Sequence, residues 1–185
     1  MNTKEKILQA AILLFRRHGY AGTATLAIAK EAGVSEMTLF RYFKSKENLF
    51  YEAVDAITAD ADLSALQSCL TGDPQKDLLR LAEHILHYFM EQNHMIRMML
   101  FESMNQPALL HTLRKTPLRN NDFLCRYFAE LQMPDPQQAA ELFVSALFGY
   151  AIGIRSLQEE PLSDDAVQAF AHSAAQLILL SIRPK

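Results

Sequence analysis

The side chains best suited to contact another molecule are concentrated between residues 23 and 46. Hydroxyl, aromatic, thioether and charged side chains follow one another there, over a short helical stretch and the residues just after it. Hydroxyl and ammonium groups are common donors to phosphate oxygens, whereas side chains on an exposed helix can contact base edges in the major groove. The residue types and their spacing therefore indicate recognition of a nucleic acid.

The spacing of apolar residues gives this region the layout of a helix-turn-helix. It predicts a short helix over residues 24–32, a tight turn at Gly33-Val34 and a second helix over residues 35–43. Gly33 stands where the backbone needs a positive φ angle, which glycine adopts without strain. Both helices are too short to be stable alone, so they must pack on the preceding helix. The side chains expected to make this contact are Ile28, Ala29, Val34, Leu39 and Phe43.

Residues 3–50 resemble the TetR family of bacterial transcriptional regulators. The resemblance is carried by Gly19-Tyr20, Thr23, Ile28-Ala29, Ala32-Gly33-Val34-Ser35, Thr38-Leu39-Phe40-Arg41-Tyr42-Phe43 and Ser45-Lys46-Glu47. For residues 51–185 the similarity is limited to length and helical pattern. The resemblance implies a homodimeric repressor that binds a duplex DNA operator and releases it when the C-terminal domain binds a small molecule.

Three positions depart from the residues that are frequent in this family. Met37 stands where a small residue, commonly glycine, is usual, and Leu26 replaces a residue that is often polar or basic. Ala24 replaces a frequent Thr or Ser. These departures predict an apolar contact from Met37, such as one with a thymine methyl group, and fewer phosphate contacts from the first short helix.

Residue chemistry and the resemblance together assign roles in DNA binding. We expect phosphate contacts from Thr25, Thr38, Tyr42 and Lys46, a phosphate or groove contact from Arg41, and base contacts from Glu36, Met37 and Phe40; Ser35 caps the helix that carries most of them. Glu36 would accept a hydrogen bond from a cytosine amine. The alternative is that Phe40 and Tyr42 are packed aromatics and that Lys44 and Lys46 belong to a solvated face.

The charge distribution supports a polyanionic partner for the N-terminal region. The whole chain has a net charge of −3, but residues 1–50 carry eight basic and four acidic side chains, a net charge of +4. Residues 51–185 carry the compensating acidic excess. A basic head on an acidic body predicts that the head, and not the body, contacts DNA.

The remaining sequence predicts an all-α chain of ordinary soluble composition. We expect helices over residues 3–18, ended by Gly19, and from Ser45 past Ala59, with Thr23 capping the first helix of the helix-turn-helix. Further helices are expected over residues 75–92, 94–104, 108–131 with a break near Pro117, 137–157 and 164–182. The predicted organisation is a DNA-binding domain at residues 1–46, joined by the fourth helix to an effector-binding and dimerisation bundle at residues 47–185.

A region rich in methionine and aromatic residues is the candidate site for an effector. Its members are His87, Tyr88, Met95, Met98, Met99, Phe101, Phe123, Phe128 and Phe143. Methionine fills irregular space and adapts to varied ligands, so the composition favours a mainly apolar small molecule of unknown identity. Polar groups for one end of such a ligand would be His84, His87, Glu91 or Glu102. Each residue taken singly is equally compatible with an ordinary hydrophobic core.

Small residues at helical spacing mark the candidate dimer interface. They lie in the last two predicted helices, together with larger apolar neighbours: Ala146, Gly149, Tyr150, Gly153, Ala171, Ala174 and Ile178. Small side chains let a facing helix approach closely, so two such helices from each chain would form a four-helix interface. The alternative is that these helices only close the core of the monomer.

Other classes of function lack the residues they need. Glu91 and His94 have the Glu-x-x-His spacing of di-iron bundles, but no second copy follows, and no phosphate-binding loop, nucleophile motif or metal-ligand cluster is present. We therefore expect no enzyme, cofactor or metal. Cys69 and Cys125 form no disulfide framework, which favours a cytoplasmic protein. The longest uncharged apolar stretch, residues 142–154, is too short to span a membrane, so no membrane partner is expected.

Overall fold

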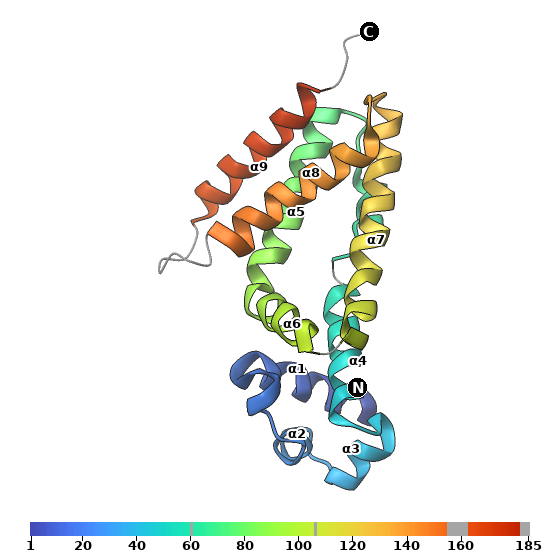
Figure 1. The fold of residues 1–185 in the computed structure, drawn as a ribbon, viewed down its shortest axis with the longest axis vertical. Helices are drawn as coiled ribbons and strands as arrows, with labels where there is room; N and C mark the ends of the chain where they lie inside the picture. The colour runs from blue at the N-terminus through green and yellow to red at the C-terminus, as the bar shows by residue number, and fades with distance from the viewer. Residues whose placement is uncertain (60, 106, 155–162, 182–185) are drawn as a thin grey trace. The chain divides into compact units, whose positions relative to one another are not determined.

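The computed structural model describes residues 1–59, 61–105, 107–154 and 163–181 (Figure 1). Within these ranges the chain is helical and contains no strand, so the predicted all-α class is confirmed. The elements are α1 (Thr3–Gly22), α2 (Thr25–Glu31), α3 (Glu36–Phe43), α4 (Lys46–Ala59), the 3₁₀ helix η1 (Leu63–Cys69), α5 (Pro74–Glu91), α6 (Asn93–Asn105), α7 (Pro107–Glu130), α8 (Pro136–Phe148), the π-helical turn η2 (Gly149–Ile154) and α9 (Asp164–Leu179).

The chain divides into two compact units. The first comprises Met1–Asp60 and His94–Lys115, and the second comprises Ala61–Asn93 and Thr116–Lys185. The first unit thus holds α1 to α4 together with α6 and the beginning of α7. The second holds η1, α5, the rest of α7, α8, η2 and α9. These units are defined by their internal contacts and not by function. The predicted boundary at residue 46 between a DNA-binding and an effector-binding domain therefore stays a prediction.

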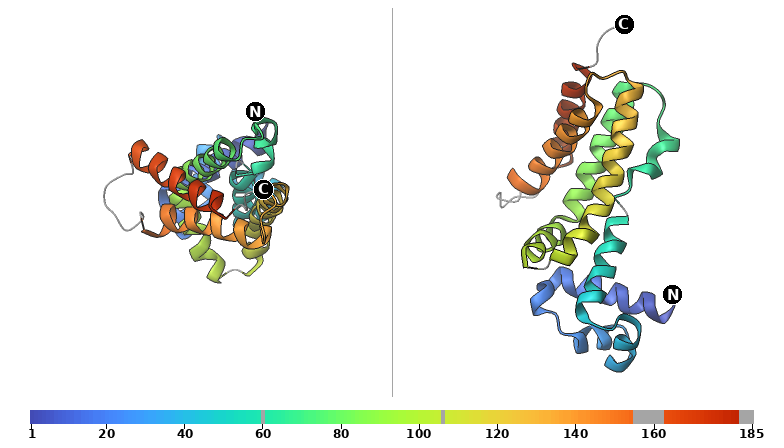
Figure 2. Two further views of the ribbon diagram at one scale, coloured as in Figure 1. Left: turned by 90° about the horizontal axis from the view of Figure 1, so that it is seen from above. Right: turned by 45° about the vertical axis from the view of Figure 1, so that its right-hand side comes forward.

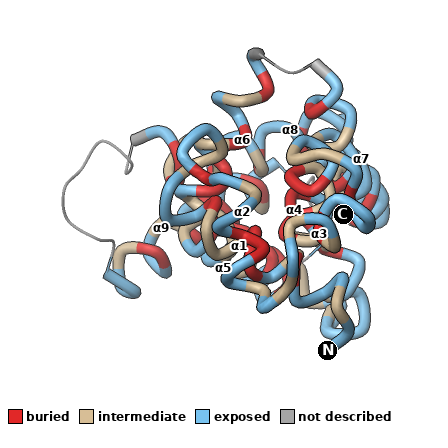
Figure 3. Tube along the Cα trace, turned by 90° about the horizontal axis from the view of Figure 1, so that it is seen from below, coloured by how far each residue is buried: buried red, intermediate tan, exposed pale blue. Residues whose placement is uncertain are grey.

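The core of the first unit lies where α1 packs on α4 and on the helix-turn-helix. Ile7, Ala11 and Phe15 of α1 are buried, as are Ile28, Leu39, Phe43, Leu49 and Phe50. The rings of Phe15 and Phe50 meet edge to face with centroids 5.1 Å apart. Figure 3 shows the buried stretches of α1 and α4 beside the more exposed α2 and α3. The short helices therefore depend on α1 and also on α4 for their stability, whereas the sequence predicts packing on the preceding helix alone.

The end of α1 differs from the prediction in where the helix ends and in the role of Thr23. Gly19 breaks the helical geometry as expected, with φ of 71°, and one further turn follows to Gly22. Thr23 does not cap α2, because its buried hydroxyl lies 2.7 Å from the carbonyl oxygen of Gly19 and 3.1 Å from that of Leu14. The N-cap of α2 is Ala24, which offers no side-chain cap. The prediction for Thr23 is wrong because this hydroxyl serves carbonyl groups of α1 instead.

The second unit is built around α5, which packs on α9 and α8 (Figure 2). Asp73 caps α5 and accepts hydrogen bonds from the N–H groups of Gln75 and Lys76. In the first turn of α5 the buried carboxylate of Asp77 accepts hydrogen bonds from the N–H groups of Thr71 (2.7 Å) and Gly72 (2.9 Å). This carboxylate fixes the loop before α5, because it satisfies donors that would otherwise be unpaired.

The α7 helix does not break near Pro117, so that expectation is wrong. It continues to Glu130 although Pro117 lies in its interior. A proline there removes one backbone hydrogen bond and costs roughly 3 kcal/mol in an isolated helix. The buried side chains of Leu109, Phe123, Leu124 and Phe128 show that packing holds both halves of α7 in place.

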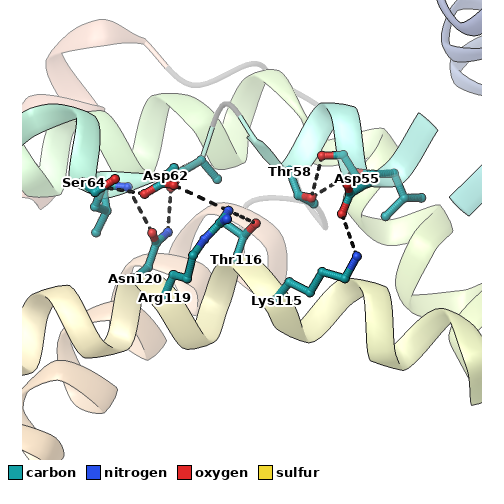
Figure 4. Close-up of polar contacts among 11 residues, drawn as sticks. Asp55, Thr58, Asp62, Ser64, Lys115, Thr116, Arg119 and Asn120 are labelled. Carbon is teal, nitrogen blue, oxygen red and sulfur yellow. Dashed lines mark hydrogen bonds and ion pairs between the residues drawn. The ribbon is translucent and has the colours of Figure 1, made fainter. Parts of the chain in front are cut away.

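Polar side chains of α7 contact α4 and the segment that follows it (Figure 4). In the first unit Lys115 forms an ion pair of 3.2 Å with Asp55. In the second unit the Asn120 amide donates to the carbonyl oxygen of Ala61, at 2.6 Å, and accepts from the N–H of Leu63, at 3.0 Å. The same side chain thus satisfies backbone groups at the start of η1, an element that the sequence did not reveal.

Candidate nucleic-acid interface

The α3 helix is held by a cap at its start and by two buried anchors. Ser35 is the N-cap, and its hydroxyl accepts from the N–H of Thr38 at 3.2 Å. The side-chain hydroxyls of these two residues lie 2.9 Å apart. Leu39 and Phe43 are fully buried, so they fix the inner face of α3 against the rest of the unit. The helix is therefore rigidly placed although it has only eight residues.

The turn before α3 has the geometry that the sequence predicts. Gly33 adopts φ of 68°, which confirms the expected left-handed conformation. The N–H of Val34 donates to the carbonyl oxygen of Ala29 at 2.9 Å and closes the turn at the end of α2. A side chain at position 33 would be strained by the backbone conformation alone. The turn consequently sets the direction in which α3 leaves α2.

The outer face of α3 presents large side chains to solvent. Met37 is 83% exposed and Phe40 is 40% exposed, and Arg41 and Tyr42 lie beside them. Leu26 of α2 is also exposed, at 65%. Exposed apolar side chains that lie together on one surface often mark a site where a partner binds. Such a surface can contact thymine methyl groups and base edges as well as phosphates.

The structure brings Thr25 and Glu36 together, which the sequence analysis did not anticipate. The Thr25 hydroxyl donates to Glu36 Oε1 at 2.6 Å. Thr25 begins α2 and Glu36 begins α3, so the bond joins the two helices of the motif. Only the positions of both residues at helix starts could have signalled this contact.

The basic side chains near α3 are held in different ways. The Arg41 guanidinium lies 5.4 Å from the centroid of the Tyr42 ring. Lys44 ends the helix with φ of 67°, and its ammonium donates to the carbonyl oxygen of Arg41 at 3.3 Å. Both arrangements leave the positive charges at the surface, where phosphates can approach.

Lys46 is less exposed than its proposed role suggests. Its ammonium lies 4.4 Å from the centroid of the Tyr20 ring, and the residue is half-buried. Burial lowers the pKa of Lys46, and the negative charge of Glu102 on α6 partly offsets this effect. At the same place Ser45 caps α4 by accepting from the N–H of Asn48 at 3.1 Å. The ammonium and the start of α4 are thus adjacent, and the latter also favours an anion.

Comparisons with known proteins agree with this geometry. A profile described as bacterial regulatory proteins of the tetR family matches residues 7–53, which include all of α2 and α3. The HTH-type transcriptional regulator YvkB of Bacillus subtilis is 27% identical over 184 residues, which cover 95% of each chain. The chain belongs to the TetR family. It is a DNA-binding transcriptional regulator, and its relatives are regulators and not enzymes.

Solved structures share the fold of this TetR-family regulator over nearly its whole length. A TetR-family regulator from Mesorhizobium loti has a TM-score of 0.84 at 22% identity and covers 96% of this chain and 95% of its own. The flavonoid-responsive regulator FrrA has a TM-score of 0.70 at 28% identity and covers 99% and 98%. The predicted arrangement of a helix-turn-helix head and a helical bundle is therefore confirmed at the level of the fold.

The candidate effector residues of this regulator lie in both units. Met95, Met98, Met99 and Phe101 belong to the first unit, and His87, Tyr88, Phe123, Phe128 and Phe143 belong to the second. Phe128 and Phe143 are buried and meet edge to face with centroids 6.0 Å apart. Phe101 and His87 are exposed, and a ring nitrogen of His87 lies 2.8 Å from the carbonyl oxygen of Glu83. Phe101 and His87 therefore lie outside the cores of their units.

His84 of α5 has an unsatisfied polar atom. Its Nε2 is buried and has no hydrogen-bond partner among the residues that the structure describes. Burial lowers the pKa of His84, the positive charge of His87 lowers it further, and Glu91 opposes both. A buried polar atom without a partner costs free energy, so this atom is suited to accept or donate a bond to another molecule.

The candidate dimer residues occupy two different environments. Ala146 and Gly153 are exposed, and Gly149 is half-buried. Tyr150 is half-buried and stacks on Phe170, with centroids 3.8 Å apart. Ala171, Ala174 and Ile178, in contrast, are buried within the second unit. Large apolar side chains are exposed at Leu177 of α9 (67%), at Leu180 just after α9 (82%) and at Leu142 of α8.

The residues that the structure describes contain neither a metal-binding cluster nor a membrane-spanning helix. No three His, Cys, Asp or Glu residues there are placed to hold a metal ion. None of the described helices combines the length and the apolar character that crossing a bilayer requires. Cys69 and Cys125 are free thiols.

Proposed function

We propose that this chain is a ligand-responsive transcriptional repressor, which binds a near-palindromic operator as a homodimer and leaves it on binding a mainly apolar small molecule. The observation that carries the proposal is the rigidly capped α3 helix with its exposed apolar and basic outer face. Residues 1–46 would form the DNA-binding domain and residues 47–185 the effector-binding and dimerisation domain. A relative of Pseudomonas putida, the HTH-type transcriptional repressor NicS, is 27% identical over 118 residues.

In this proposal α3 enters the major groove. Glu36, Met37 and Phe40 would contact base edges, and Thr38, Arg41, Tyr42 and Lys46 would contact phosphates or the groove wall. Ser35 would hold the helix in register. Incubating the protein with labelled genomic fragments of a bacterium in a mobility-shift assay tests this role. We expect retention of a few fragments at 150 mM salt; equal retention of all fragments would contradict sequence-specific binding.

The outer faces of α8 and α9 are the proposed dimer interface. Leu142 and Ala146 of α8 and Gly149 at the start of η2 would meet Leu177 of α9 and Leu180, the residue after α9, from a second chain. Ala171, Ala174 and Ile178 would support this interface from beneath, because they are already buried. Leu177→Glu should convert the dimer to a monomer in light scattering, whereas His172→Glu, on an exposed position of α9, is the matched control. A dimer that persists in Leu177→Glu would move the interface elsewhere.

The effector would bind in the second domain, among its aromatic side chains. The aromatic residues of α5, α7 and α8, the unsatisfied Nε2 of His84 and the 28% identity with a flavonoid-responsive regulator support a planar, mainly apolar ligand with one polar end. A ligand can weaken DNA binding only to the extent that its affinity is higher for the DNA-free conformation than for the DNA-bound conformation. The family of the chain supports a response of this kind.

Thermal shift and operator binding test the effector proposal together. A panel of flavonoids and other planar apolar compounds should include one that raises the melting temperature and weakens operator binding in the same concentration range. His84→Ala should abolish both responses if this residue holds the polar end, while His111→Ala, an exposed position, leaves them intact. An effector confined to multiply charged metabolites would contradict the proposal.

A further inference from the structure

The hydrogen bond between Thr25 and Glu36 has two unusual properties. Its length of 2.6 Å is at the short end of the range for O–H···O hydrogen bonds. Both side chains are half-buried, so the bond lies at the edge of the motif and not in its core. It fixes a negative charge beside the outer face of α3, on a protein whose partner is a polyanion.

Two further features favour a fixed carboxylate at this position. Glu36 stands in the first turn of α3, where the positive end of the helix dipole stabilises a negative charge. The cap of Ser35 holds the backbone of the same turn. Glu36 is thus restrained by the backbone and by the Thr25 hydroxyl, although a glutamate on a helix surface is ordinarily free to rotate.

The same bond excludes one role for Thr25. A threonine hydroxyl has a single proton, and Thr25 donates it to Glu36. A phosphate oxygen accepts hydrogen bonds and cannot donate one. The Thr25 hydroxyl therefore cannot donate to a phosphate oxygen while it holds Glu36, so in this inference the side chain has a role other than the expected phosphate contact.

A carboxylate held at the start of α3 discriminates among bases by their major-groove edges. Cytosine and adenine present an amine there, whereas guanine and thymine present keto oxygens that repel a carboxylate. The adenine amine lies next to N7, which is also an acceptor, so cytosine is the better partner. We propose that Thr25 is a positioning residue that holds Glu36 in place to select a cytosine at one position of each half-site.

The test uses variants that separate the hydroxyl from the shape of the side chain. Thr25→Val removes the hydroxyl and keeps the volume, Thr25→Ser keeps the hydroxyl, and Glu36→Gln removes the charge. The affinity of each variant is measured for the operator duplex and for duplexes in which each half-site position carries one of the three other bases. Wild type should prefer cytosine at one position by roughly 10-fold, the size of one good base contact. Thr25→Val should lose most of this preference, and Thr25→Ser should retain it.

Non-additivity gives the most specific readout of a positioning role. If Thr25 acts only through Glu36, adding Thr25→Val to Glu36→Gln should change the base preference no further. Glu36→Asp, whose carboxylate is too short for the bond, should behave as Thr25→Val does and provides a second variant should Thr25→Val be unstable. Melting temperatures of all variants confirm that the fold is retained.

The outcomes distinguish this inference from the proposed function on which it rests. An unchanged cytosine preference in Thr25→Val overturns the inference alone. So does an equal loss of affinity for every sequence with a smaller salt dependence, since that result identifies a phosphate contact. Absence of any sequence preference in the wild type would overturn both the inference and the base reading by α3.

Discussion

The first and second units use helices in opposite ways. In the first, α2 and α3 have seven and eight residues and bury only a few side chains each, so most of their surface is available to a partner. In the second, α5 and α9 have 18 and 16 residues and bury long apolar faces. In the first unit, the residues that can recognise DNA are therefore different from the residues that form its core. In the second unit, the candidate ligand residues Phe128 and Phe143 belong to the core itself.

The largest contrast between the units should come from removing one aromatic ring in each. Phe128→Ala leaves a cavity in a fully buried site and should lower the free energy of unfolding by about 3–5 kcal/mol. Phe40→Ala removes a ring that is 40% exposed and should lower it by less than about 1 kcal/mol, but weaken operator binding. Urea unfolding and fluorescence anisotropy measure the two effects. A large stability loss in Phe40→Ala would assign this ring to the core.

The sequence predicted the head more fully than the second unit, for physical reasons. Ser35 and Gly33 act through the backbone of their own turn, so local sequence suffices to predict them. Pro117 was misjudged because distant packing holds α7 together. Ala171, Ala174 and Ile178 were predicted to face a second chain and are buried within the second unit, and periodicity does not tell whether an apolar stripe faces its own core or a second chain.

The candidate site was predictable residue by residue but not in its internal contacts. The exposure of Met37 and Phe40 followed from their place on a short helix whose other face is anchored. The bond between Thr25 and Glu36 joins residues eleven positions apart, and its formation depends on the angle that Gly33 sets between α2 and α3. Lys46 was expected at the surface, and its position on the Tyr20 ring likewise depends on how α4 packs on α1.

Two similar helix caps, one in each unit, allow a comparison in which the expected effects are of intermediate size. Ser35 and Ser163 cap α3 and α9, and accept from N–H groups at 3.2 and 3.3 Å. Replacing either serine by alanine should cost about 1 kcal/mol of stability. Only Ser35→Ala should also weaken operator binding, because α3 carries the proposed base-reading face and α9 does not. Equal losses of operator affinity in both variants would show that stability alone limits binding.

Acid should destabilise the second unit through His84. Burial lowers the pKa of His84 in the folded chain, so the unfolded chain binds more protons as the pH falls through the ordinary histidine range. Stability from this residue is complete above about pH 6.5 and falls as the pH decreases below it. Comparing melting temperatures at pH 7.5 and 5.5 should show a smaller drop in His84→Gln than in wild type. An identical drop would mean that His84 is accommodated equally well when charged.

The smallest effect concerns one phosphate contact at the start of α4. Lys46→Ala should weaken binding to all sequences about equally and lower the slope of log affinity against log salt by about one unit. Lys44→Ala is the matched comparison, because Lys44 is exposed and its charge lies at the surface. Affinity titrations between 50 and 300 mM salt measure both slopes. An unchanged slope in Lys46→Ala would restrict this ammonium to its contact with Tyr20.

Selection of binding sites from random-sequence duplexes tests the central claim most directly, namely that the outer face of α3 reads base edges. Wild type should enrich a near-palindromic site whose half-sites lie about one helical turn apart, or a little more. Met37→Ala should enrich a site of the same spacing with a changed preference at one position of each half-site. The account is contradicted if no common sequence emerges, or if Met37, Phe40 and Arg41 variants all select the wild-type site.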